Sequence, residues 1–350
     1  MTMRHEPVLD GLRAIAVLMV IVSHAGLGNV VPGGFGVTIF FFLSGYLITS
    51  LLRSEAATAQ GVSLKQFYAR RALRIFPPFY ITMAVALVLI ATGVLSPPAG
   101  PHAVLLDALF LSNYAYLWTD QIGVPIPLWS LDVEEHYYLL FPAIFIVLQK
   151  RFQPASVAAI IVGLCAVTLA IRAYNAATLP NFGLNYYWTH TRIDSILFGA
   201  CLAVWNNPMD ENSWVPKTWH AGAAVAAVVT TFLIRDPVFR ETVKYSIQGV
   251  ALFVIFAFLL HDRGILRRLL SCWPLQWIGL LSYTLYLCHV PALKLAHQNA
   301  PDLGKLGAGV VGFVLSLVFA LAMFWLVEKP LARLRKTLHK REPEQKLATT

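Results

Sequence analysis

Ionisable side chains interrupt several long apolar stretches of this sequence. The stretch LDGLRAIAVLMVIVSHAGL contains Asp10, Arg13 and His24. Arg13 and His24 are eleven positions apart, which is about 16 Å and close to three turns of a helix, so both project from nearly the same face at different depths. A lone ionisable group deep in a bilayer costs at least about 2.5–3.5 kcal/mol, so this face should line a cavity or a partner helix. Alternatively, Arg13 reaches the cytoplasmic headgroups and His24 anchors the outer interface.

A second polar cluster begins the stretch WSLDVEEHYYLLFP. We expect Glu134 to lie at about the depth of His24, where its carboxylate would orient the imidazole and raise its basicity. His136 is a rival base, and the alternative is a polar cluster at the membrane interface. The neighbouring candidates for a supporting or acceptor site are Trp129, Ser130 and Glu135.

Two later stretches also bring polar residues to the outer level. THTRIDSILFGACLAVW contains Arg192 and Asp194, which we expect to pair with each other or with Glu134. The stretch SYTLYLCHVP adds Tyr283, Tyr286 and His289, which are also ordinary anchors near a membrane boundary.

Arginines cluster directly before a pair of prolines in FYARRALRIFPPFY. Arg71 and Arg74 are three positions apart, so in a helical segment they share a face, and their guanidinium groups together with Arg70 suit a phosphorylated ligand. The alternative is an ordinary cluster of positive charge on the cytoplasmic side. In the preceding apolar run FFFLSGYLI, Ser44 and Gly45 permit close approach of another helix.

The composition requires a membrane to position these residues. The 350 residues are 57% hydrophobic and 13% charged with a mean hydropathy of +0.64, which excludes a soluble domain. The net charge of +9 lies mainly in short loops, where it sets topology and attracts anionic lipids, so membrane lipids are expected partners and nucleic acid is not. The cysteines lack metal-ligand spacing, so we expect no metal site.

We predict an all-α polytopic bundle of about ten transmembrane helices over residues 1–335. The basic tail 336–350 is expected to be cytosolic and disordered. The apolar segment 103–118 suits an interfacial or re-entrant segment as well as a span. If it does not cross, the basic loops share one side, which places both termini in the cytoplasm. The predicted spans are 8–27, 33–52, 76–96, 128–148, 155–174, 190–206, 219–234, 244–261, 274–296 and 305–327.

The order of these segments from Pro7 to about Arg335 resembles the membrane-bound acyltransferase-3 family, bacterial enzymes that O-acylate lipopolysaccharide and other glycans. The resemblance rests on LDGLRAIAVLMVIVSH, FFFLSGYLI, FYARRALRIFP, WSLDVEEHYYL, TRIDSILFGA, SYTLYLCHVP and EKPLARL. It implies that His24 and Arg13 are essential, that Arg71 and Arg74 serve acyl-CoA, and that Glu134 belongs to the active centre. Similar proteins commonly have glutamine where this chain has His136. The chain also lacks the extracytoplasmic hydrolase-like domain of some members, which implies a standalone form.

We therefore expect an O-acyltransferase in the bacterial inner membrane that moves an acyl group, acetyl being the commonest family choice, from cytoplasmic acyl-CoA to a carbohydrate hydroxyl. Acyl-CoA would be a co-substrate, with no tightly bound cofactor, and the oligomeric state is left open. His24 would act either as general base or as a nucleophile that carries the acyl group. The competing hypotheses are a proton-coupled secondary transporter and a lipid-linked glycosyltransferase.

Overall fold

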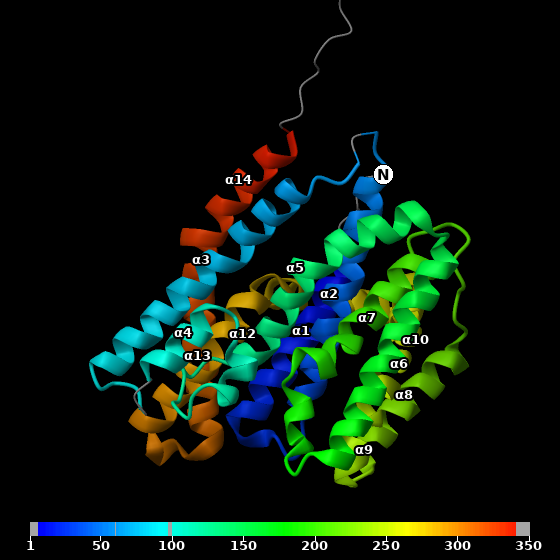
Figure 1. The fold of residues 1–350 in the computed structure, drawn as a ribbon. Helices are drawn as coiled ribbons and strands as arrows, with labels where there is room; N and C mark the ends of the chain where they lie inside the picture. Colours follow the sequence, from blue (N-terminus) through cyan, green and yellow to red (C-terminus); the bar gives the residue numbers. More distant parts are fainter. Residues whose placement is uncertain (1–5, 60, 97–99, 341–350) are drawn as a thin grey trace, which may run out of the picture.

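The structure, a computed structural model, describes residues 6–59, 61–96 and 100–340 as helices joined by turns and loops, which confirms the all-α membrane bundle (Figure 1). Each predicted span corresponds to one long helix. These are α1 (Pro7–Val22), α2 (Gly33–Ala56), α3 (Leu64–Ala91), α5 (Leu128–Arg151), α6 (Pro154–Thr178), α7 (Thr189–Trp205), α8 (Thr218–Leu233), α10 (Val243–His261), α12 (Trp273–Asn299) and α13 (Gly304–Met323).

Short helical segments connect or extend these long helices. Two are π-helical turns, η1 (Ser23–Leu27), which continues α1, and η5 (Phe324–Glu328), which continues α13. The others are α4 (Pro101–Ala108), η2 (Ser112–Leu117), η3 (Phe182–Tyr186), α9 (Pro237–Glu241), α11 (Ile265–Leu270), η4 (Pro301–Leu303) and α14 (Lys329–Lys340).

Among the described residues, seven helices are long and apolar enough to cross a membrane, which makes this a multi-pass membrane protein. The remaining three predicted spans form α5, α7 and α8. Helices α7 and α8 have 17 and 16 residues, and α5 contains the polar cluster of Asp132, Glu134, Glu135 and His136. The count of ten crossings stays a prediction.

The apolar segment 103–118 forms two short helices rather than one span. Helix α4 has eight residues, about 12 Å, and Phe110, with φ of 56°, separates it from η2. Neither piece is long enough to cross a hydrocarbon core of about 30 Å. The segment therefore supports the topology in which it does not cross.

Both described ends of the chain lie at the same end of the bundle (Figure 1). We call this the basic end, because the chain there includes Lys150, Arg151 and the tail helix α14. Its cytoplasmic location stays a prediction. Helix α14 continues to Lys340, five residues into the predicted tail, and residues 341–350 lie outside the described part of the chain.

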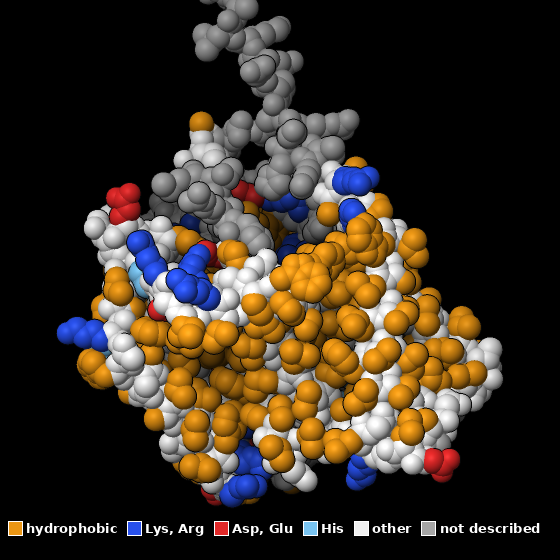
Figure 2. Space-filling model, turned by 180° about the vertical axis from the view of Figure 1, so that it is seen from behind, with side chains coloured by type: hydrophobic (Ala, Val, Ile, Leu, Met, Phe, Trp, Pro, Cys, Tyr) orange, Lys and Arg blue, Asp and Glu red, His pale blue; other side chains and the backbone are white. Residues whose placement is uncertain are grey.

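The surface shown in Figure 2 is dominated by hydrophobic side chains, while lysine and arginine side chains gather near its upper and lower edges. Large apolar side chains such as Leu139, Val162 and Val310 are at least half exposed (63%, 50% and 64%). Such a surface is stable only in an apolar surrounding, which is the physical reason for the membrane location.

The third long helix begins well before the predicted span 76–96. Helix α3 begins at Leu64, after Ser63, whose Oγ accepts a hydrogen bond from the Gln66 amide, so Arg70, Arg71 and Arg74 lie within the helix. The apolar run marked where membrane-compatible sequence begins, whereas the helix begins at its cap, three turns earlier. The arginines therefore project from a rigid helix.

Helices α2 and α7 pack closely at the centre of the bundle (Figure 1). A Cβ atom on Gly45 would lie 1.9 Å from the carbonyl oxygen of Ile196, and one on Gly199 would lie 2.0 Å from that of Phe42. This reciprocal contact confirms that Gly45 permits close helix approach.

We expect Gly45→Ala to lower the free energy of unfolding by about 1–3 kcal/mol, because backbone atoms cannot move aside as a flexible side chain would. Gly163→Ala on α6 is the matched control, since a Cβ there meets no atom within 4 Å. Thermal unfolding of both variants in detergent measures the difference. Equal stability of the two variants would contradict the packing described here.

Candidate active site

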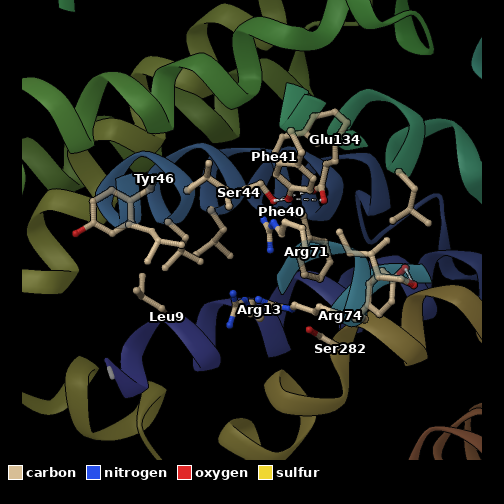
Figure 3. A pocket seen from close by; sticks show the side chains of 18 of the residues that line it. Leu9, Arg13, Phe40, Phe41, Ser44, Tyr46, Arg71, Arg74, Glu134 and Ser282 are labelled. Carbon is tan, nitrogen blue, oxygen red and sulfur yellow. Dashed lines mark hydrogen bonds between the residues drawn. The ribbon is translucent and has the colours of Figure 1, made fainter. Parts of the chain in front are cut away.

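A cavity of about 450 Å³ lies between α1, α2, α3, α5 and α12, and we call it the central pocket (Figure 3). Its lining runs along α2 from Leu51, near the basic end, to Val37, a distance of fourteen residues or about 21 Å. At the basic end the lining includes Glu6 and Met209. The cavity is therefore elongated and penetrates most of the membrane depth.

Arg13, Arg71 and Arg74 all line the central pocket, and Figure 3 shows the guanidinium groups of Arg13 and Arg71 directed into it. Arg13 forms a 3.0 Å ion pair with Asp10, another lining residue. The Arg71 guanidinium lies 4.0 Å from the centre of the Tyr138 ring, and its buried Nε has no hydrogen-bond partner. The pocket thus combines three cations from two helices.

Arg70 does not line the central pocket. It forms an ion pair with Glu55 of α2 instead. Of the three arginines that the sequence grouped together, the structure therefore brings only Arg71 and Arg74 to the pocket, as their spacing of three positions predicts.

Glu134 is also in the central pocket, where Ser44 Oγ and Tyr138 OH donate hydrogen bonds of 2.9 and 3.0 Å to its carboxylate. Tyr138 OH lies 2.8 Å from Ser44 Oγ as well. Tyr138 escaped the sequence reasoning, although its position four residues after Glu134 places it on the same helix face. Glu135 lines the pocket too, with one buried carboxylate oxygen unpartnered.

We expected Glu134 to contact His24, but its hydrogen-bond partners are Ser44 and Tyr138. A position along a helix sets the depth of a residue, but the direction of its helix face depends on packing. The face of α5 that bears Glu134 points toward α2 and α3, whereas His24 lies on the π-helical turn η1, which packs against α12 and α13.

His24 instead contacts His289. The two rings are 5.0 Å apart, with His24 Nδ1 3.4 Å from His289 Nε2 and 2.9 Å from the Val20 carbonyl oxygen. His289 is fully buried, and its Nδ1 lies 2.7 Å from the Tyr286 carbonyl oxygen. Carbonyl oxygens only accept, so both Nδ1 atoms carry hydrogen. The Nε2 lone pair of the exposed His24 is then available as a base or nucleophile.

Tyr286 lies between the central pocket and this histidine pair. It lines the pocket, its hydroxyl lies 2.6 Å from Ser130 Oγ, and its ring centre is 5.6 Å from that of His289. One turn earlier, Tyr283 OH donates to the Ile75 carbonyl and joins α12 to α3. Ser130, Tyr283 and Tyr286 therefore all line the central pocket, and their supporting role stays a prediction.

The predicted pairing of Arg192 and Asp194 is wrong. Residues two positions apart point to different helix faces. Both oxygens of the fully buried Asp194 accept hydrogen bonds from Arg172 of α6, at 2.9 and 2.7 Å. Arg192 donates to Thr38 and lies 3.8 Å from the centre of the Tyr245 ring. The sequence could have identified Arg172, because it is a lone arginine in an apolar run and a charge inside the membrane requires a partner.

Two further candidates lie outside the central pocket. His136 Nδ1 is 2.7 Å from Thr189 Oγ1, so this rival base joins α5 to α7. Trp129 packs against Tyr186 and Tyr187 and is not among the residues that line the central pocket. Within the described ranges, no group of three or more His, Cys, Asp or Glu side chains is arranged to hold a metal ion.

The fold and the site define a membrane-embedded helical protein with an arginine-lined pocket reaching inward from one end and a histidine pair near the pocket's inner end. The chain belongs to the acyltransferase-3 family, because residues 6–328 match that family's acyltransferase domain.

Similar proteins include peptidoglycan O-acetyltransferase OatA of Listeria monocytogenes, which is 34% identical over 83% of this chain and 50% of the relative. The putative peptidoglycan O-acetyltransferase YrhL of Bacillus subtilis is 31% identical over 94% of this chain and 55% of the relative. A putative O-acetyltransferase of Staphylococcus aureus, SAS0844, is 30% identical over 94% and 57%. The chain thus spans about half the length of these relatives. No solved structure shows significant similarity.

Proposed function

We propose that this protein transfers an acetyl group from acetyl-CoA, bound in the central pocket, to a hydroxyl group of a glycan at the opposite end of the bundle. The family assignment and the O-acetyltransferase names of the relatives support the chemistry. The single observation that carries the assignment to this site is His24, whose Nε2 is unoccupied near the inner end of a pocket that contains three arginines.

The donor enters the central pocket from the basic end, which we place in the cytoplasm of a bacterium whose inner membrane holds the protein. Its phosphates bind Arg71 and Arg74, since guanidinium groups bind phosphate in charge-assisted, often bidentate hydrogen bonds. The pantetheine arm extends toward Val37, next to Gly36, which packs on Ala16 and Val20 of α1. Val20 is four residues before His24, or about 6 Å along the helix.

In direct transfer, His24 Nε2 removes the proton of the glycan hydroxyl while the hydroxyl oxygen attacks the thioester carbonyl. The carbon–sulfur bond breaks, the acetyl–oxygen bond forms, and the coenzyme leaves as a thiolate that takes up the proton. In the covalent route, His24 Nε2 itself attacks the thioester carbonyl and the thiolate leaves. The glycan oxygen then attacks the acyl-histidine and displaces neutral imidazole, and the hydroxyl proton passes to the thiolate. Both routes use the same nitrogen of His24.

Glu134, in this proposal, acts in the donor pocket beside Arg71 rather than on His24. Its hydrogen bonds to Ser44 and Tyr138 fix a negative charge near the cations, which keeps the guanidinium groups oriented when the donor is absent.

The test is transfer of label from [¹⁴C]acetyl-CoA to a soluble glycan oligomer by the purified protein in lipid nanodiscs. We expect labelled ester on the glycan, released by mild alkali. A protein that moves acetyl-CoA or protons without producing acetylated glycan would support the transporter hypothesis and overturn the proposal.

A further inference from the structure

A second cavity, of about 380 Å³, lies at the other end of the bundle from the chain termini, and we call it the outer pocket. Its wall is formed by α4, η2, the loop 119–127, the first turn of α5 and parts of η3 and α12. The volume falls in the range of about 300–1,000 Å³ that is usual for small-molecule sites. The residues that carry the argument are Asp107, Asn113, Gln121, Trp129, Tyr187 and Lys294.

Asn113 is held in this wall by its own hydrogen bonds. Its backbone N–H donates to the fully buried Asp132 at 2.8 Å, and its Nδ2 donates to Thr189 Oγ1 at 2.9 Å and weakly to the Tyr187 carbonyl oxygen at 3.4 Å. Because a carbonyl oxygen only accepts, the amide orientation is determined. Its Oδ1 is buried and has no hydrogen-bond partner, so this wall contains one unsatisfied acceptor.

Aromatic rings form another part of the wall. The centre of the Trp129 ring lies 5.4 Å from the centre of the Tyr187 ring and 4.6 Å from that of the Tyr186 ring, so both tyrosines pack against it. Aromatic faces of this kind accept the C–H side of a sugar ring, whereas amide and carboxylate groups bind the hydroxyls around its edge. Asp107 and Lys294 contribute one charge of each sign, so the wall suits a neutral sugar better than a phosphate.

Asp107 has a second role in shaping the wall. Its Oδ2 accepts a 2.7 Å hydrogen bond from the Val124 amide, which ties α4 to the loop 119–127. Burial raises the pKa of Asp107 to about 6, so at neutral pH the group is mainly ionised and its carboxylate accepts hydrogen bonds.

The two pockets approach each other along helices α5 and α12. On α5, Trp129 lines the outer pocket and the next residue, Ser130, lines the central pocket. On α12, Tyr286 lines the central pocket and Lys294 the outer one, and His289 lies between them, about 4.5 Å and 7.5 Å away along the axis. The His24–His289 pair is therefore at the level where ligands of the two pockets would meet.

We propose that the outer pocket binds the acceptor, namely a neutral hexopyranose unit of a glycan chain. This inference rests on the proposed function. A small rotation of the Asn113 side chain lets its Oδ1 accept a hydrogen bond from a hydroxyl or amide N–H of the sugar. Trp129 contacts the apolar face of the sugar, and Lys294 donates to a ring-edge oxygen. A neighbouring hydroxyl then faces His24.

The experiment measures equilibrium binding of a tetrasaccharide of β-1,4-linked N-acetylglucosamine to the protein in nanodiscs without acetyl-CoA. We expect Asn113→Leu and Lys294→Met each to weaken binding about tenfold or more, with the KM for acetyl-CoA unchanged. Asn113→Leu could disturb folding, because Asn113 joins η2 to Asp132 of α5. Lys294 is only half-buried, so Lys294→Met tests the site without that risk. The matched control is Arg235→Met, which removes an exposed cation just before α9 and outside the outer pocket and should leave binding unchanged.

The two hypotheses fail differently. If the wild type binds the tetrasaccharide with the expected variant pattern but never acetylates it, the proposed function is wrong and the sugar site stands. If the wild type acetylates glycan but Lys294→Met and Asn113→Leu bind and use it as the wild type does, the outer-pocket assignment is wrong. Absence of saccharide binding by the wild type overturns the assignment as well.

Discussion

His24→Ala will lower the rate of acetyl transfer to glycan by about 10²–10⁴-fold, the usual contribution of a positioned general base. Loss of a covalent acyl carrier would have an effect at least as large. The imidazole is the only group at the inner end of the central pocket to which we assign a proton or an acyl group. The measurement is the initial rate of label transfer from [¹⁴C]acetyl-CoA at saturating substrates.

His297→Ala is the matched control, because His297 shares the local environment of His24. It is exposed, lies on α12 toward the same end, and its Nδ1 contacts the carbonyl oxygen of Leu293, four residues earlier, as that of His24 contacts Val20. We expect wild-type rates from this variant. A His24→Ala variant that folds and retains more than a tenth of the activity would remove His24 from the reaction.

The same assay separates the two chemical routes. Incubation with labelled acetyl-CoA and no glycan should leave label on wild-type protein, but not on His24→Ala, if the acetyl group passes through an acyl-histidine. Kinetics that require both substrates to be bound together, with no label on the protein, would instead establish direct transfer.

Arg71→Ala combined with Arg74→Ala will raise the KM for acetyl-CoA by about 30- to 1,000-fold. Each lost guanidinium–phosphate contact is worth about 1–2 kcal/mol at such a partly exposed position, discounted from the usual strength of hydrogen bonds to charged groups. We expect kcat to change much less, since the arginines bind the distant end of the donor and not the thioester.

Lys150→Ala with Arg151→Ala is the control for this double variant. It removes the same two positive charges from the basic end, but its exposed residues are outside the central pocket. Both double variants should insert normally, because the other basic residues still set the topology. Equal KM values for the two would show that Arg71 and Arg74 act only as topological charges.

Helix positions could be read from the sequence because the bilayer imposes a simple requirement, namely enough consecutive apolar residues to cross it. The long helices match the predicted spans, and the break at Phe110 divides the segment 103–118, which the sequence left open between a span and a re-entrant segment. The start of α3 was missed because helix ends depend on caps such as Ser63, which apolar runs do not reveal.

The site was only partly predictable. Spacing placed Arg71 and Arg74 on one face, and the central pocket collects both. Depth alone suggested that Glu134 would contact His24 and that Arg192 would pair with Asp194, yet the partners are Ser44 and Tyr138 for Glu134 and Arg172 for Asp194. Those partners come from other helices, so choosing them required the rotation of each helix about its axis.

The amino-acid sequence by itself determined that this protein is a membrane helix bundle, that a few polar residues are held at depth, and that the order of its motifs belongs to the acyltransferase-3 family. Only the tertiary structure decided which of those residues meet. It placed Glu134 in an arginine-lined pocket, paired His24 with His289, and paired Asp194 with Arg172, which the sequence had not singled out. The physical reason is that hydropathy constrains how deep a residue lies, whereas its contacts depend on how the helices rotate and pack.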